Sequence, residues 1–313
     1  MKKMLAILFV VVLCVCGSAM AQDTYHVGIS QLVQHVALDA ATQGFQDALK
    51  EKLGDAVEFD VQNASGDSNT CSTIVNTFIS NGVDLIMANA TPALQAAVAA
   101  TGDIPILGTS VTDYATALDI DDWTGATGMN VSGTSDLAPL SEQADMLHEL
   151  FPEAKNVGLL YCSAEPNSKY QVDVITEYLK EYGYNVTEYT FADSNDVASV
   201  TQTAADGSDV LYIPTDNTAA SCTEAIRNVV EPAGVPVIAG EEGLCASTGV
   251  ATLSISYYDL GYTTGEMAYE ILVNGADVST MDIQFAPKVT KEYNAELAEL
   301  MGVEIPEDYV AIQ

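Results

Sequence analysis

The sequence predicts an α/β protein of two similar lobes, each built on a parallel sheet with helices on both faces. Three observations support this prediction. Short apolar runs typical of buried strands alternate with helix-length amphipathic segments. The alternation fades near residue 120 and starts again near residue 156. A single sheet of all these strands would need about ten parallel strands, and sheets of that size usually split.

The first series of strands and helices covers residues 25–120. Leu38, Ala41 and Phe45 recur at helical spacing, and Pro92 stands in a first helical turn, where its missing N–H costs no hydrogen bond. We expect strands at 25–30, 57–62 and 84–88 and from residue 105, with helices at 37–53, 70–81 and 92–101.

The second series covers residues 156–255 and repeats the order of the first. We expect strands at 156–161, 185–191, 209–213, 236–239 and 250–254, and helices at 170–182, 197–205 and 219–230. Beyond it we expect a helix at 258–273, a strand at 282–286 and a helix at 291–301.

The segment 121–131 is rich in Gly, Thr and Asn and is interpreted as the first crossover between the lobes. The late segments are expected to return to the first lobe. We therefore assign residues 22–122 and 258–286 to lobe 1, and residues 123–257 and 287–313 to lobe 2, joined by crossover strands.

The N-terminus has the pattern of a signal peptide over residues 1–21: a basic start, a short apolar core and small residues at the cleavage point. The core is shorter than the roughly 20 residues that span a bilayer. Cleavage after Ala21 would release a soluble extracellular or periplasmic protein. The segment 13–17 also resembles a lipobox, although Val15 stands where a small residue is preferred. Lipidation of Cys16 would anchor the chain on the outer face of the cytoplasmic membrane.

The composition argues against several partners. The formal charge is −34 at pH 7, so nucleic acid and anionic membrane surfaces would be repelled. Six cysteines are present, and four of them follow the signal region without the spacing of a zinc or redox site. A disulfide between Cys222 and Cys245 and isolated thiols both stay open.

Motifs for catalysis are absent from the sequence. There is no GxGxxG after the first strand, and no GxxxxGK[ST], HExxH or GxSxG anywhere in the chain. The chain has three histidines, and a hydrolytic triad would have to use His35. We expect no enzyme activity, no cofactor and no metal ion.

The loops that follow the strands are the expected ligand site, because ligands of such sheets bind beyond the carboxyl ends of the strands. These loops carry hydroxyl, amide and carboxylate groups and almost no cations. A ligand carboxylate could bind helix N-termini near Thr91 or Ser168, and a ligand ammonium could pair with Asp216 or Glu165. This pattern suits a zwitterion, although the same residue types are also ordinary helix caps.

Eight stretches in one order resemble the family of ABC-transporter substrate-binding proteins that includes tryptophan and tyrosine binders. They are HVALDAATQGFQDAL, QNASGD, DLIMANATPALQA, IPILGTSVTDY, VSGTSD, NVGLLYCSAEPNS, YIPTDNT and SYYDLGYTTGEMAYEIL. The resemblance implies the type I periplasmic-binding fold and a monomer that closes like a clamshell. It also implies delivery of an aromatic amino acid to a membrane permease with a separate ATPase.

Carried onto this chain, the resemblance implies one set of ligand contacts drawn from both lobes. The set is His35, Thr91, Thr112, Asp113, Glu165, Asn167, Ser168, Asp216, Asn217, Tyr257, Tyr258 and Asp259. Three positions depart from the family pattern, namely Val36 in place of proline, Asn89 in place of a small apolar residue and Cys162 in place of asparagine.

Two other functions compete with transport. An exported enzyme acting on a small metabolite would need a positioned base, and the loops offer only His35. A sensor ectodomain would be expected to continue into a membrane-spanning segment. A sugar or a short peptide is the alternative ligand to an amino acid.

Overall fold

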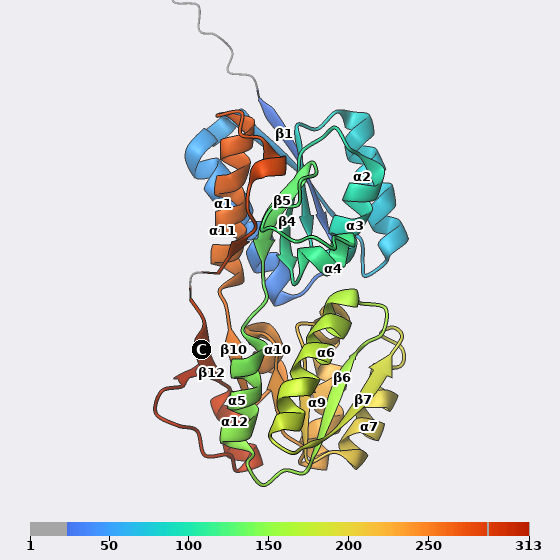
Figure 1. Cartoon of the computed structure of the whole chain (residues 1–313), viewed down its shortest axis with the longest axis vertical. Helices are drawn as coiled ribbons and strands as arrows, with labels where there is room; N and C mark the ends of the chain where they lie inside the picture. Colours follow the sequence, from blue (N-terminus) through green and yellow to red (C-terminus); the bar gives the residue numbers. More distant parts are fainter. Residues whose placement is uncertain (1–23, 287, 313) are drawn as a thin grey trace, which may run out of the picture.

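The computed structural model describes residues 24–286 and 288–312 and contains two α/β lobes, one above the other in Figure 1. Each lobe has a central sheet between two layers of helices. The predicted fold class, two parallel-sheet lobes joined by crossovers, is therefore confirmed. Residues 1–21, where the signal peptide is predicted, lie outside the described part of the chain.

The first lobe contains a six-stranded parallel sheet in the order β11-β5-β4-β3-β1-β2. Its strands are β1 Tyr25–Gln31, β2 Val57–Asn63, β3 Leu85–Asn89, β4 Ile106–Val111, β5 Val131–Ser135 and β11 Gln284–Phe285. Its helices are α1 Val36–Leu53, α2 Ser68–Asn81, α3 Thr91–Ala100, α4 Tyr114–Leu118 and α11 Tyr257–Leu272, with short 3₁₀ turns at Gly54–Ala56 and Val278–Thr280.

The second lobe contains a seven-stranded sheet in the order β13-β12-β10-β9-β8-β6-β7. Its strands are β6 Asn156–Cys162, β7 Asn185–Phe191, β8 Val210–Ile213, β9 Val237–Ala239, β10 Ala251–Ser254, β12 Thr290–Tyr293 and β13 Val310–Ala311. Its helices are α5 Leu140–Leu150, α6 Pro166–Glu181, α7 Val197–Gly207, α8 Asn217–Ser221, α9 Thr223–Ala233, α10 Glu242–Ser247 and α12 Ala295–Met301.

Each sheet separates two hydrophobic cores. In the first lobe, α1 and α11 cover one face and α2 and α3 cover the other. The pair α1 and α11 packs closely because glycines stand at the contact, and a Cβ atom at Gly44 or Gly261 would overlap backbone carbonyls of the facing helix. In the second lobe, α5 and α6 cover one face and α7 and α9 the other.

Several predicted elements differ from the structure. The expected helix at 291–301 starts as the strand β12, which pairs antiparallel with β10, and only its second half is the helix α12. The expected helix at 219–230 is two helices that meet at Cys222. The helix α5 contains His148, which the sequence places in a helix without bounds. None of the helices in the described segments is both long and apolar enough to cross a bilayer.

The first crossover lies later than the sequence analysis places it. The strand β5 pairs with β4 in the first sheet, so the chain leaves lobe 1 after Ser135 and not at 121–131. The reason is that the Gly- and Thr-rich segment is an irregular loop of lobe 1 that leads into β5. The chain crosses again between β10 and α11 and between β11 and β12.

Both sheets share the strand order in which the first strand lies between the second and the third. In such sheets the chain turns to opposite sides after the first and third strands, which opens a crevice at their carboxyl ends. The crevice in lobe 1 lies beyond β1 and β3, and that in lobe 2 lies beyond β6 and β8. The two crevices belong to facing lobes, since His35 after β1 contacts Asn217 after β8.

Candidate ligand-binding cleft

A cleft of about 320 Å³ lies between the lobes, within the range of small-molecule sites. Lobe 1 contributes the loops after β1 and β2 and the start of α3, and lobe 2 contributes the loops after β6 and β7 and the start of α8. We call this space the interlobe cleft. Its lining residues are Leu32, Val33, Ser65, Gly66, Asp67, Ser68, Pro92, Cys162, Ala164, Glu165, Ala192, Asp193, Ser194, Asn195, Asn217, Thr218 and Ser221.

Glu165 lies at this cleft but is saturated with hydrogen bonds from its own lobe. Its Oε1 accepts from the backbone N–H and the hydroxyl of Thr218, both at 2.8 Å. Its Oε2 accepts from the N–H of Asn217 at 3.0 Å, from Asn217 Nδ2 at 2.7 Å and from Asn167 Nδ2 at 3.1 Å. Five donors occupy a carboxylate that offers about four lone pairs. Glu165 therefore holds the start of α8 in place.

Asp216, like Glu165, accepts hydrogen bonds that hold segments of lobe 2 together. Its Oδ1 accepts from the N–H of Ala219 at 2.8 Å, which makes it the N-cap of α8. Its Oδ2 accepts from the N–H of Cys162 and from the hydroxyl of Ser168, both at 2.7 Å. Burial raises the pKa of Asp216, and the neighbouring Glu165 raises it further. All three hydrogen bonds stay within lobe 2.

Where β3 and β4 end, next to the lobe 1 lining of the interlobe cleft but not part of it, two residues have an unusual backbone conformation. Ala90 and Ser110 have φ angles of 91° and 55°, in the left-handed region that non-glycine residues rarely occupy. Such backbone geometry concentrates at binding sites. Both residues are buried, as are Thr91 and Thr112 beside them, and the Ser110 hydroxyl has no hydrogen-bond partner among the described residues.

His35 contacts the other lobe. Its Nε2 lies 3.3 Å from Oδ1 of Asn217, and burial lowers the pKa of its imidazole. A neutral imidazole at this place can donate to the amide oxygen. His35 thus joins the two crevices, and within the described residues it has no hydrogen bond to a serine or cysteine side chain.

Two buried acids that the sequence analysis did not single out lie near the crossovers. Asp136 follows β5, and its Oδ2 accepts from the hydroxyl of Tyr257 at 2.9 Å. Burial raises the pKa of Asp136 to about 6 and that of Glu241 to about 7. Asp136 stands at the end of the quoted VSGTSD stretch, and its position directly after a strand was the available signal.

The remaining candidates differ in their surroundings. Tyr257 is buried and faces Asp136, whereas Tyr258 is exposed and donates to Asp47 on α1 at 3.1 Å. Asp113 caps α4, and Asp259 is exposed in the first turn of α11. The structure therefore groups His35, Glu165 and Asn217 around the interlobe cleft and places Tyr258 and Asp259 apart from it.

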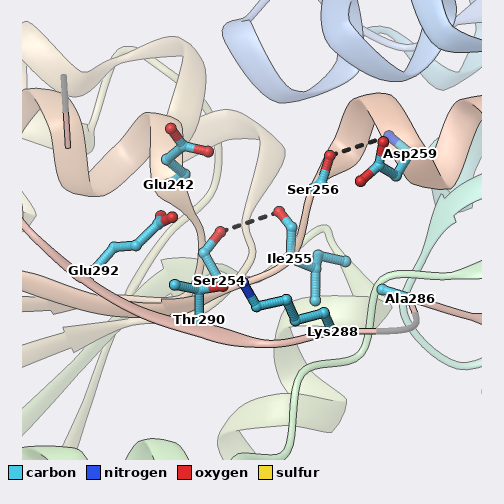
Figure 2. A pocket seen from close by; sticks show the side chains of 9 residues that line it. All are labelled: Glu242, Ser254, Ile255, Ser256, Asp259, Ala286, Lys288, Thr290 and Glu292. Atoms are coloured by element: carbon cyan, nitrogen blue, oxygen red, sulfur yellow. Dashed lines mark hydrogen bonds between the residues drawn. The ribbon is translucent and has the colours of Figure 1, made fainter. Parts of the chain in front are cut away.

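A second cavity, of about 190 Å³, lies against the crossover segments (Figure 2). Ser256 and Lys288 line it from two of these segments, and the carboxylates of Glu242 and Glu292 lie on the same side of it. Burial, together with the charge of Glu242, raises the pKa of Glu292 to about 7. This cavity lies after β10 and beside β12, away from the ends of β1, β3, β6 and β8 where the two crevices lie, so we do not assign the ligand to it.

The cysteines of the described residues are all free, so the disulfide considered between Cys222 and Cys245 is wrong. Cys245 lies on the buried face of α10, where its neighbours include Ala239 and Gly249. Cys162, one of the departures from the family pattern, lines the interlobe cleft. Within the described segments, no group of three or more His, Cys, Asp or Glu side chains has the arrangement of a metal site.

Two parallel-sheet lobes, three crossovers and a polar cleft between the lobes define a binding protein of the type I periplasmic-binding fold. Residues 26–312 match the model of the ABC transporter substrate binding protein family. The chain belongs to this family. A relative named tyrosine-binding protein, from Clostridioides difficile strain R20291, is 40% identical over 264 residues, which cover 82% of this chain and 76% of that protein.

Solved structures agree with this assignment. An ABC domain from Streptococcus pneumonia in complex with L-Trp is 31% identical, with a TM-score of 0.87 and coverage of 91% of this chain and 97% of that one. A conserved domain protein from Vibrio cholerae is 33% identical, with a TM-score of 0.88 and coverage of 93% and 100%.

A third structure differs in a useful way. The ligand-free, open structure of a substrate-binding protein from Clostridium difficile is 38% identical over 93% of this chain and 99% of that one, but its TM-score is 0.70. The sequence of this open structure is thus more similar to this chain than the sequence of the L-Trp complex is, while its overall shape is less similar to this chain. A change in the angle between two conserved lobes lowers a whole-chain score in this way. The structure described here is therefore more similar in overall shape to the L-Trp complex than to this ligand-free, open structure.

Proposed function

We propose that this protein is the extracytoplasmic solute receptor of an ABC importer and that it binds an aromatic amino acid, tyrosine or tryptophan, in the interlobe cleft. The observation that carries the proposal is the double similarity to a tyrosine-binding protein and to an L-Trp complex, each across most of the chain. Among the described residues, the lining of the cleft is neutral and acidic without lysine or arginine, which suits a ligand that carries its own positive charge.

Lobe closure would turn binding into a signal for the permease. A ligand drives closure only when it contacts both lobes, because it shifts the equilibrium by its difference in affinity for the open and closed forms. The lining of the interlobe cleft comes from both lobes, and His35 and Asn217 already link them. The closed form would then dock on the permease, whose separate ATPase drives release.

For the ligand carboxylate we propose the N-terminus of α3. The helix starts without a side-chain cap, so its first N–H groups are free to receive an anion. Thr91 and the unpartnered hydroxyl of Ser110 are buried close to it in sequence and in the sheet. This arrangement needs no arginine, in agreement with the lining of the cleft.

The proposal is tested by calorimetry and by thermal unfolding with the twenty amino acids, several sugars and short peptides. Tyrosine or tryptophan at a hundred times its Kd is expected to stabilise the protein by about 2.7 kcal/mol. Stabilisation by a sugar or a peptide, with no effect of any aromatic amino acid, would overturn it. Mass spectrometry of the purified protein identifies any ligand that it retains.

Export, anchoring and assembly are part of the same proposal. The predicted signal peptide implies an extracytoplasmic location, either free after cleavage at Ala21 or anchored through Cys16. The intact mass of the protein from its native membrane distinguishes the two. The protein is proposed to act as a monomer, which light scattering in solution tests.

A further inference from the structure

The cavity of about 190 Å³ in Figure 2 lies at the links between the lobes, and we call it the hinge cavity. Ile255 and Ser256 line it, and these two residues are the whole link between β10 in lobe 2 and α11 in lobe 1. Ala286 and Lys288 line it from the link between β11 and β12. When two lobes change their angle, such links take up the change in backbone torsions. The walls of the hinge cavity therefore move when the lobes move.

Glu292 lines the hinge cavity from β12 with an unsatisfied carboxylate. The residue is partly buried, and its Oε2 is buried without a hydrogen-bond partner in the part of the chain that the structure describes. None of the ion pairs among these residues includes it. Its neighbour across the strand pair is Thr252 of β10, whose buried hydroxyl also lacks a partner there. A negative charge on Glu292 is costly in these surroundings, and the uptake of a proton removes that cost.

The groups around Glu292 make its charge sensitive to pH. Burial and the charge of Glu242, at the start of α10, raise the pKa of Glu292 to about 7, while Lys288 opposes the rise. Asp259, in the first turn of α11, adds a carboxylate of lobe 1 to the same cavity. Cys245 lies near these acids on α10, and burial raises the pKa of its thiol, which stays neutral. Glu292 therefore gains and loses its charge near neutral pH.

The proton on Glu292 is linked to the angle between the lobes, because the links that move form the walls around its carboxylate. If these links move apart, water reaches the carboxylate and its ionised form costs less. We propose that protonation of Glu292 stabilises the lobe arrangement described here and that its ionisation favours an arrangement with a more open hinge. The described arrangement is closer in shape to the L-Trp complex than to the ligand-free, open relative. This inference goes beyond the proposed function and does not depend on which solute binds.

Other titrating groups lie near the contact between the lobes, and the test has to separate them from Glu292. Burial raises the pKa of Asp136 to about 6 and that of Glu241 to about 7, and it lowers the pKa of His35. None of these three residues lines the hinge cavity. A replacement of Glu292 leaves all three in place, so the difference between the wild type and that variant isolates Glu292.

The experiment is X-ray scattering of the protein, freed of retained ligand, between pH 5 and pH 8.5. The pKa of Glu292 is raised from an ordinary 4.5 to about 7, so its stabilisation of the described form is complete below about pH 4.5 and is lost as pH rises through 7. In the wild type the radius of gyration is expected to increase with pH, with a midpoint near 7. The ratio of the described form to the more open form should fall at least about tenfold over this range. Glu292→Gln is neutral at every pH, so it should lose this midpoint and stay compact at pH 8.5.

Two neighbours are expected to shift the midpoint in opposite directions, which a purely structural role of Glu292 would not produce. Glu242→Gln should lower the midpoint, and Lys288→Gln should raise it. Glu299→Gln is the matched control, because it removes the same charge at an exposed position of α12 and should keep the wild-type profile. A wild-type radius that stays constant from pH 5 to pH 8.5 overturns the inference even if no variant folds. A wild-type profile in Glu292→Gln overturns it as well.

Discussion

Replacing Glu165 by glutamine separates a scaffold role from a ligand role at the interlobe cleft. The carboxylate accepts five hydrogen bonds, from Thr218 on one oxygen and from Asn217 and Asn167 on the other. A glutamine keeps the size of the side chain but turns one oxygen into an NH₂ group. Whichever way the amide is placed, this group faces at least two donors that then lose their acceptor.

The magnitude follows from those lost bonds. A buried donor without an acceptor costs about 1–3 kcal/mol. Two such donors predict a loss of about 2–6 kcal/mol, lower when the Thr218 hydroxyl can rotate to another partner. In a protein of this size such a loss corresponds to a melting temperature lower by roughly 4–12 °C.

Urea unfolding and thermal unfolding measure the effect, and tyrosine titration measures binding in parallel. Asp193→Asn is the matched control, because Asp193 lines the same cleft but is exposed and bonds only to Asn195. It is expected to leave stability within about 0.5 kcal/mol of the wild type. If Glu165→Gln is as stable as the wild type yet loses tyrosine binding, the scaffold argument is refuted and Glu165 is a ligand contact.

Three further predictions concern pH, lobe closure and thiols. Burial raises the pKa of Asp136 to about 6 and of Glu241 to about 7, so both bind protons more readily in the folded state. The stabilising contribution of these two groups is then fully present below about pH 4 and is lost as pH rises through 6 to 7, by up to about 3 kcal/mol per group; a melting temperature that rises over this range contradicts it. A Cβ atom at Gly243 would lie 3.2 Å from Cβ of Val36 in the other lobe, so a leucine at this position should hold the lobes apart. Gly243→Leu is expected to increase the radius of gyration in X-ray scattering and to weaken ligand binding about tenfold. Adding Val36→Ala should restore part of the binding. Cys222 alone among the described cysteines is partly exposed, so one thiol should react with Ellman's reagent in the native protein and four in denaturant; no native reaction would contradict the exposure.

The sequence predicted the local elements well where periodicity was strong. Helix α1 and strand β7 lie within one residue of their expected bounds, because their apolar spacing has only one regular solution. The prediction from the sequence failed for the segment that starts at residue 291, because the composition of this segment is typical of a helix. There Thr290–Tyr293 pairs with β10, and a strand partner distant in sequence outweighs local propensity.

Which residues meet in space was decided by the tertiary structure. The sequence identified the strand-end loops as the site and gave the residue types that suit a zwitterion. It could not show that backbone and side-chain donors of lobe 2 occupy the oxygens of Glu165 and Asp216, since most of these donors are about 50 residues away in the chain. Nor could it show that Asp136 meets Tyr257, because the segment that contains β5 was assigned to the wrong lobe.

By itself, the sequence determined two α/β lobes, the family and an acidic surface, because these follow from patterns that are local or repeated along the chain. Only the tertiary structure decided where the lobes cross and which carboxylates hold the scaffold of lobe 2 together. Hydrogen bonding of a buried group depends on every neighbour within about 3 Å, and most of those neighbours come from distant segments.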